Sequence, residues 1–303
     1  MARVPKINLD ITHRCTLQCQ RCNRAIFAAA GVKVPGEDMS IDNFKKILDF
    51  FGQIIFCGQL SDPIFHPKFI DFLKLCKDKK VSVHTAASHK KEEWYRKAFE
   101  ANTNAYWTFG IDGLPKDSHK YRINQDGEHL FKMACIASKI VKRVTWQYLI
   151  FNYNENNIDE ARKLAKDNNL ILELQKSPRF WEDDPLKPTN KDYYIERILK
   201  EKVMKINPKC EKGEHSKDYA TSAKGFLLPC CWCDTVNPSS DKELMKLFRP
   251  HLHLDKVDSM EEILLSNEWL DFKKSITTDN DKAPKVCKRY CATNQQFKGV
   301  VND

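Results

Sequence analysis

The sequence has no run of apolar residues that approaches the roughly 18 needed for a membrane helix. Its amino-terminal residues, MARVPKINLD, lack the apolar segment that a secretory signal carries. No internal repeat of about 20 to 50 residues and no low-complexity tract is apparent. We therefore expect a cytoplasmic protein with an ordinary globular core and no membrane partner.

Charge and cysteine content narrow the class of protein further. The chain has 303 residues, 42% of them hydrophobic and 30% charged, so one large domain and a small one fit its length. Twelve cysteines without a secretory signal favour metal ligation or catalysis over a disulfide framework. The net charge of +9 comes from scattered lysines, which we interpret as solvated helix faces. The alternative is an acidic-peptide or nucleic-acid surface, and we expect no nucleic acid partner.

Strand-like and helix-like segments alternate along the first 176 residues. This alternation argues for a parallel sheet, because each parallel crossover needs a helix to return the chain. The sheet can be open or a partial barrel, and in both cases functional groups gather at the carboxyl ends of the strands. Strands are expected at 6–11, 53–57, 81–86, 105–111, 144–151 and 171–175, and helices after residue 40, over 69–76, 90–101 and 157–168, and near 127–140.

The alternation stops after Gln175. Three prolines among charged residues, Pro178, Pro185 and Pro188, predict an irregular linker that runs into a short helix near 192–204. Beyond it, the last third of the chain holds half of the cysteines. We expect three parts: a first domain at 1–176, a linker and helix at 177–204, and a second domain at 205–303.

Three cysteines lie close together after the first expected strand, in the stretch INLDITHRCTLQCQRCNR. Cys15, Cys19 and Cys22 follow the spacing C-x3-C-x2-C, which is improbable by chance. A structural zinc ion would need a fourth ligand, for which His13 is a candidate. Three thiolates suit a four-iron cluster better, because the missing fourth ligand leaves one iron open to a substrate or cofactor.

This spacing after a first strand resembles the radical S-adenosylmethionine (radical SAM) superfamily, whose fold is an α/β partial (β/α)6 barrel similar to a TIM barrel. The resemblance implies a [4Fe-4S] cluster on Cys15, Cys19 and Cys22 that binds S-adenosylmethionine at its open iron. It implies reductive cleavage to a 5′-deoxyadenosyl radical, which abstracts a hydrogen from the substrate. It also implies an external electron donor such as flavodoxin or ferredoxin.

Two later segments extend the resemblance. FCGQLSDPIFHP is similar to the glycine-rich turn that meets the methionine amine, with Gln59 in place of a second glycine. YWTFGIDGLPKDSHKYR is similar to the fourth strand, and its Arg122 matches the methionine carboxylate in geometry. Arg21 departs from the superfamily, which usually has an aromatic residue beside the adenine at that position. The cofactor contacts implied are Gly58, Gln59, Ser88, Asp112, Arg122 and Gln147.

A second set of cysteines lies in the expected second domain. The stretch AKGFLLPCCWCD carries a G-x4-C hairpin that resembles the auxiliary-cluster domains called SPASM and twitch. The resemblance implies an auxiliary [4Fe-4S] cluster, and a structural zinc ion on the same thiols is the alternative. The implied ligands are Cys210, Cys230, Cys287 and Cys291, with Cys233 or Cys231 as an alternate. We expect Cys57, Cys76 and Cys135 to be packing residues.

Taken together, these resemblances imply an enzyme that oxidises or modifies a small molecule or a peptide side chain. The residues assign no catalytic acid or base. The alternative from another class is a non-catalytic metal-binding or redox-sensing module whose clusters are structural.

Overall fold

The computed structural model describes residues 5–196, 205–210, 218–234 and 240–291. The chain divides into two compact units. Unit 1 comprises Met1–His13, Pro35–Ser61 and Ile198–Gln296, and unit 2 comprises Arg14–Val34, Asp62–Arg197 and Phe297–Asp303. No helix in the described part of the chain is both long and apolar enough to cross a membrane.

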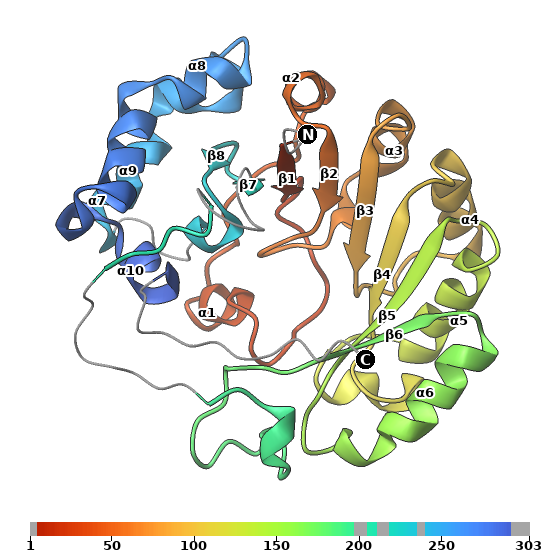
Figure 1. Ribbon diagram of the computed structural model, residues 1–303. Helices are drawn as coiled ribbons and strands as arrows, with labels where there is room; N and C mark the ends of the chain where they lie inside the picture. Colours follow the sequence, from red (N-terminus) through yellow and green to blue (C-terminus); the bar gives the residue numbers. More distant parts are fainter. Residues whose placement is uncertain (1–4, 197–204, 211–217, 235–239, 292–303) are drawn as a thin grey trace. The chain divides into compact units, whose positions relative to one another are not determined.

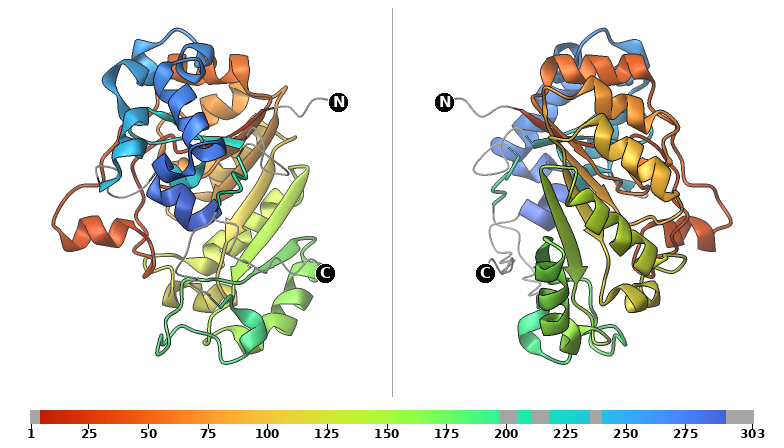
Figure 2. Two further views of the ribbon diagram at one scale, coloured as in Figure 1. Left: turned by 60° about the vertical axis from the view of Figure 1, so that its left-hand side comes forward. Right: turned by 90° about the vertical axis from the view of Figure 1, so that its right-hand side faces the viewer.

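The described residues of unit 1 form four strands in the order β2-β1-β7-β8. β1 (Lys6–Leu9) pairs in parallel with both β2 (Gln53–Phe56) and β7 (Asp218–Thr221), and β7 pairs antiparallel with β8 (Leu227–Leu228). Helices α7 to α10 gather beside β7 and β8 (Figures 1 and 2). The helices of this unit are α2 (Ile41–Phe50), α7 (Lys242–Met245), α8 (Met260–Leu264), α9 (Asn267–Thr277) and α10 (Lys285–Cys291).

In the described residues of unit 2, four parallel strands follow the order β3-β4-β5-β6. Helices α3, α4 and α5 lie on one face of these strands, as Figure 1 and the right-hand view of Figure 2 show. The strands are β3 (Lys80–Thr85), β4 (Tyr106–Gly110), β5 (Arg143–Leu149) and β6 (Ile171–Gln175). The helices are α1 (Arg24–Ala29), α3 (Phe69–Leu75), α4 (Glu92–Ala101), α5 (Gly127–Ala137) and α6 (Ile158–Asp167).

Short 3-10 turns connect these elements. In unit 2 they are η1 (Pro63–Phe65), η2 (Pro115–Lys120), η3 (Glu155–Asn157) and η4 (Lys191–Tyr193). In unit 1 they are η6 (Cys231–Cys233), η8 (Lys246–Phe248), η9 (Pro250–Leu252), η10 (Leu254–Lys256) and η11 (Asn280–Lys282).

The helices form where apolar side chains recur at helical spacing. In α2, Ser40 caps the first turn by accepting a hydrogen bond from the Asn43 amide, and Phe44 and Ile47 are fully buried. In unit 2, the rings of Phe99 and Trp107 meet edge to face with centroids 4.8 Å apart, which anchors α4 on β4. Apolar periodicity therefore selects the face of each helix that covers the strands.

The six strands and five helices expected over residues 6–175 are all present, with bounds that differ by a few residues. The expected helix near 192–204 is not formed in its described part, where only η4 is helical and Tyr194 is extended; residues 197–204 lie outside the described residues. The expected hairpin before Cys230 is the β7–β8 pair, with Gly225 at φ +81°. β7 itself was not predicted.

Candidate functional site

The three-cysteine loop follows β1 in the chain and belongs to unit 2. A tight turn joins the second and third cysteines, because the Cys22 amide donates to the Cys19 carbonyl over 3.0 Å. Three hydrogen bonds then attach the loop to residues 120–124. They run from the Gln18 amide to the Ile123 carbonyl, from Asn124 Nδ2 to the Thr16 carbonyl, and from Gln20 Nε2 to the Lys120 carbonyl.

Burial dominates the electrostatics of this loop. It raises the pKa of the Cys15 thiol to about 12, with Asp62 adding to the shift and Arg24 opposing it. Burial also raises the pKa of Cys19, while the cation of Arg122 opposes that shift. Without a metal, Cys15 and Cys19 therefore stay protonated, and binding a metal would release their protons.

Within the described ranges, no group of three or more His, Cys, Asp or Glu side chains is arranged to hold a metal ion. The donor chemistry of the loop nevertheless fits an iron-sulfur cluster. Its three nearby sulfur ligands are half-buried, and the cation of Arg122 beside Cys19 suits the negative charge of a thiolate cluster.

Arg122 and Asp112 form a buried ion pair next to Cys19. Arg122 Nε lies 2.8 Å from Asp112 Oδ2, and the Asp112 side chain is fully buried. Burial lowers the pKa of Arg122, but the charges of Asp112 and Cys19 outweigh this effect and raise it. Gly110 makes room for the guanidinium, because a Cβ there would lie 2.8 Å from Arg122 Nη2. The ion pair with Asp112 therefore holds the guanidinium in place beside Cys19.

The other predicted contacts of unit 2 are dispersed. Ser88 Oγ accepts a hydrogen bond from the Asp126 amide, which ties the end of β3 to the start of α5. Gln147 lies on β5, paired with Gly110 of β4. His119 lies in η2, and Gly113 has φ +104°, so the GIDG turn needs a glycine there. Of the predicted residues, Asp112 and Arg122 lie beside the cysteine loop.

The turn after β2 belongs to unit 1 and is the tightest backbone approach at a predicted site. A Cβ on Gly58 would lie 2.1 Å from the Ser61 carbonyl oxygen. Gly58 is not among the glycines with positive φ, so close approach alone requires glycine.

Asp10 holds this turn, a role that was not predicted from the sequence. Its carboxylate accepts hydrogen bonds from the amides of Gln59 and Leu60 over 3.0 and 3.2 Å, and from Ser61 Oγ. Burial raises the pKa of Asp10 to about 7. The signal available in the sequence was a lone acidic residue directly after an apolar strand.

In unit 2, Asp62 plays a corresponding role at the end of β3. Its carboxylate accepts from Thr85 Oγ1, over 2.8 Å to one oxygen, and from the amides of Ala86 and Ala87. Burial raises the pKa of Asp62. These contacts give Asp62 a local structural role at the end of β3.

The second cysteine group lies in unit 1. The sulfurs of Cys230 and Cys233 lie 3.8 Å apart, and the Cys233 thiol also forms a hydrogen bond with the Cys287 thiol. Burial raises the pKa of the half-buried Cys291, and the charges of Cys287 and Cys230 add to this shift. Cys233, the alternate ligand, therefore lies with Cys230, Cys287 and Cys291. Cys210 is half-buried, next to Lys209, whose backbone bonds to Cys291.

The remaining cysteines differ in burial. Cys76 is fully buried at the end of α3, and its thiol donates to the Phe72 carbonyl. Cys135 lies half-buried in α5. The Cys57 thiol lies 3.6 Å from Asn8 Oδ1, and burial, followed by the charge of Cys231, raises its pKa.

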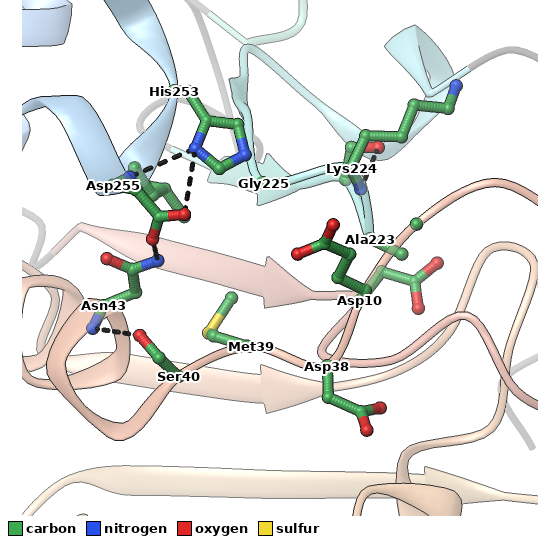
Figure 3. A pocket seen from close by; sticks show the side chains of 14 residues that line it. Asp10, Asp38, Met39, Ser40, Asn43, Ala223, Lys224, Gly225, His253 and Asp255 are labelled. Carbon is green, nitrogen blue, oxygen red and sulfur yellow. Dashed lines mark hydrogen bonds and ion pairs between the residues drawn. The ribbon is translucent and has the colours of Figure 1, made fainter.

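Unit 1 also has a pocket of about 330 Å³ at the carboxyl ends of β1 and β7 (Figure 3). Asn43 lies between Ser40 and Asp255 on its wall, and its Nδ2 donates to Asp255 over 2.6 Å. The residues that line the pocket are Asp10, Gly36, Glu37, Asp38, Met39, Ser40, Asn43, Ser222, Ala223, Lys224, Gly225, His253, Leu254 and Asp255.

No protein-family model matches the sequence, and no curated protein sequence matches it. Three crystal structures of SuiB from Streptococcus suis share its fold. The complex with precursor peptide SuiA has a TM-score of 0.60 at 9% identity and covers 95% of this chain and 71% of SuiB. The complex with S-adenosylmethionine has a TM-score of 0.57 at 12% identity, with coverages of 94% and 77%. The third has a TM-score of 0.55 at 14% identity, with coverages of 82% and 66%. The likeness establishes the fold, which spans about two thirds to three quarters of SuiB.

Proposed function

We propose that the chain is a radical SAM enzyme. The observation that carries the proposal is a C-x3-C-x2-C loop directly after the first strand, in a fold similar to that of SuiB, which has been crystallised with S-adenosylmethionine. Cys15, Cys19 and Cys22 would hold the cluster. Once bound, a cluster with one open iron supplies the electron that cleaves S-adenosylmethionine and so enables hydrogen abstraction from an unactivated carbon.

The chain's own residues would bind and orient S-adenosylmethionine. Arg122 has its Nε fixed by Asp112, so its remaining N–H donors are oriented to bind a carboxylate, such as that of methionine. Asp10 holds the Gly58–Ser61 turn so that backbone groups of Gly58 and Gln59 keep a fixed orientation. By the resemblance, this turn would contact the amine of the methionine part of S-adenosylmethionine.

The second cysteine group would hold an auxiliary cluster on Cys230, Cys287, Cys291 and either Cys233 or Cys210. The mutual contacts of Cys230, Cys233 and Cys287 support Cys233 as a ligand. A structural zinc ion on the same thiols is the alternative, because four sulfur donors also satisfy tetrahedral zinc.

The substrate would be a small molecule or a peptide side chain. The pocket of about 330 Å³ is within the size range of small-molecule sites and supports the first class. The likeness to SuiB, which was crystallised with a precursor peptide, supports the second. An external electron donor such as flavodoxin or ferredoxin would reduce the cluster.

The test is anaerobic reconstitution with iron and sulfide, followed by an assay for 5′-deoxyadenosine under reduction. The expected result is product from the wild-type chain and none from Cys15→Ala. Two four-iron clusters predict about eight irons per chain, and about four if the second group holds zinc. Product at the level of the Cys15→Ala variant would favour the non-catalytic, cluster-binding alternative.

A further inference from the structure

The side chain of Arg21 connects the cysteine loop to the segment 179–186, and both belong to unit 2. Arg21 Nη2 lies 2.7 Å from Asp184 Oδ1. Its guanidinium carbon lies 3.9 Å from the ring centroid of Trp181. In the opposite direction, Arg179 Nη1 donates to the Arg21 carbonyl over 3.4 Å. Residue 21, which lies between two cysteines, is thus held through its side chain and its backbone.

The Asp184 end of this connection is buried. Its side chain has no exposed surface, whereas that of Arg21 is 22% exposed. Asp184 Oδ1 also accepts a hydrogen bond from the Leu186 amide over 3.0 Å. A carboxylate removed from water needs a cationic or hydrogen-bonding partner, and a planar guanidinium provides one in a defined orientation.

The segment 179–186 is fixed to the body of unit 2 by contacts that do not involve Arg21. The Asn152 amide donates to the Leu186 carbonyl over 3.1 Å. Leu186 also packs in a cluster with Tyr121 and Phe151, and the half-buried Cys19 packs against the same cluster. The cysteine loop therefore contacts a preformed surface both through Cys19 and through Arg21.

We propose that Arg21 is a positioning residue that orients the turn between Cys19 and Cys22, with Asp184 as its buried anchor and Trp181 as the ring on which it stacks. The reading of this turn as part of a cluster site rests on the proposed function. The mechanical part of the proposal does not: the metal-free chain already has the contacts that restrain the turn.

The first test is amide hydrogen exchange of residues 15–24 in the full metal-free chain. Asp184→Asn removes the charge from the anchor with little change of shape, so exchange at the turn should accelerate roughly tenfold or more. Trp181→Ala removes a ring that is 52% exposed and should fold normally, with a smaller acceleration in the same residues. Arg96→Lys, whose partner Glu92 lies on the exposed surface of α4, is the matched control and should change nothing in this loop.

The second test is the electron paramagnetic resonance spectrum of the reduced, reconstituted protein. Asp184→Asn should broaden or shift the cluster signal and lower iron retention, while its thermal midpoint stays within a few degrees of wild type. Arg21→Lys, which keeps the charge and loses the planar fork, should fall between Arg21→Gln and wild type. Unchanged exchange over residues 15–24 in both Asp184→Asn and Trp181→Ala would overturn the proposal. A wild-type chain that takes up no cluster would overturn the proposed function, and the exchange result would still decide the role of Arg21.

Discussion

The two cysteine groups differ in how their thiols are brought together. Cys15, Cys19 and Cys22 come from one loop, and one backbone and two side-chain hydrogen bonds to residues 120–124 keep it in place. The thiols of the second group come from distant segments, with Cys230 and Cys233 at η6 and Cys287 in α10. The first group can therefore keep its shape without a metal, whereas the second depends on the folding of unit 1.

The neighbours of the two groups differ as well. The first has a cation beside it, because Arg122 acts on Cys19 and Arg24 acts on Cys15. The neighbours of the second group are mainly its own thiols. The hydrogen bond between Cys233 and Cys230 lowers the pKa of Cys230 and raises that of Cys233. A nearby cation favours the binding of an anionic ligand that can exchange. Surrounding thiols favour a metal ion whose ligands are all sulfur. The two cysteine groups therefore differ in the charge of their surroundings as well as in how the chain assembles them.

Replacing one buried and one half-buried cysteine tests this difference between the two groups. Cys233→Ser places a hydroxyl in a fully buried position, so the free energy of unfolding of the metal-free chain should fall by about 1–3 kcal/mol. Cys22→Ser changes a half-buried position and should cost less than about 0.5 kcal/mol, yet abolish 5′-deoxyadenosine formation. Urea unfolding under reducing conditions and product analysis measure the two effects. Equal destabilisation by both variants would show that the groups do not differ.

A second pair of variants compares a glycine in the β7–β8 turn of unit 1 with a glycine that lies against Arg122 in unit 2. Gly225→Ala should cost about 1–2 kcal/mol, because residue 225 has φ +81° and the new Cβ would meet the His253 ring. Gly110→Ala should disturb Arg122 instead, since its Cβ would lie 2.8 Å from Arg122 Nη2. Thermal unfolding should detect the first variant, and equilibrium binding of S-adenosylmethionine to the reconstituted chain should detect the second. If Gly110→Ala binds as wild type does, Arg122 is not a ligand contact.

Much of unit 2 could be predicted from the sequence, because its strands and helices carry their own apolar periodicity. The parallel pairing of β7 with β1 could not, since DYAT is short and its partner lies at the other end of the chain. The G-x4-C hairpin was predictable because a tight turn at Gly225 is a local property.

The candidate site divides in the same way. The cysteine spacing is local and visible in the sequence. The contact between Arg21 and Asp184 joins residues 163 positions apart, and no local pattern indicates it. The Asp10 contacts with the Gly58–Ser61 turn cross from β1 to β2, so only the pairing of these strands reveals them.

The carboxyl group of Asp10 should make the stability of unit 1 depend on pH. Burial raises the pKa of Asp10 from 3.8 to about 7, so the folded chain holds a proton there that the unfolded chain releases. The stability associated with this proton is fully present below about pH 4 and is lost as the pH rises towards 7. Asp10→Asn keeps the acceptor oxygen for the Gln59 and Leu60 amides and cannot ionise. It should therefore match wild type at pH 4 and be about 1–2 kcal/mol more stable at pH 8, because a shift of one pKa unit corresponds to about 1.4 kcal/mol and relaxation around the carboxylate reduces the total. Urea unfolding at both pH values measures this. A variant that is less stable than wild type at pH 8 would show that the ionised carboxylate, rather than the neutral acid, holds the Gly58–Ser61 turn.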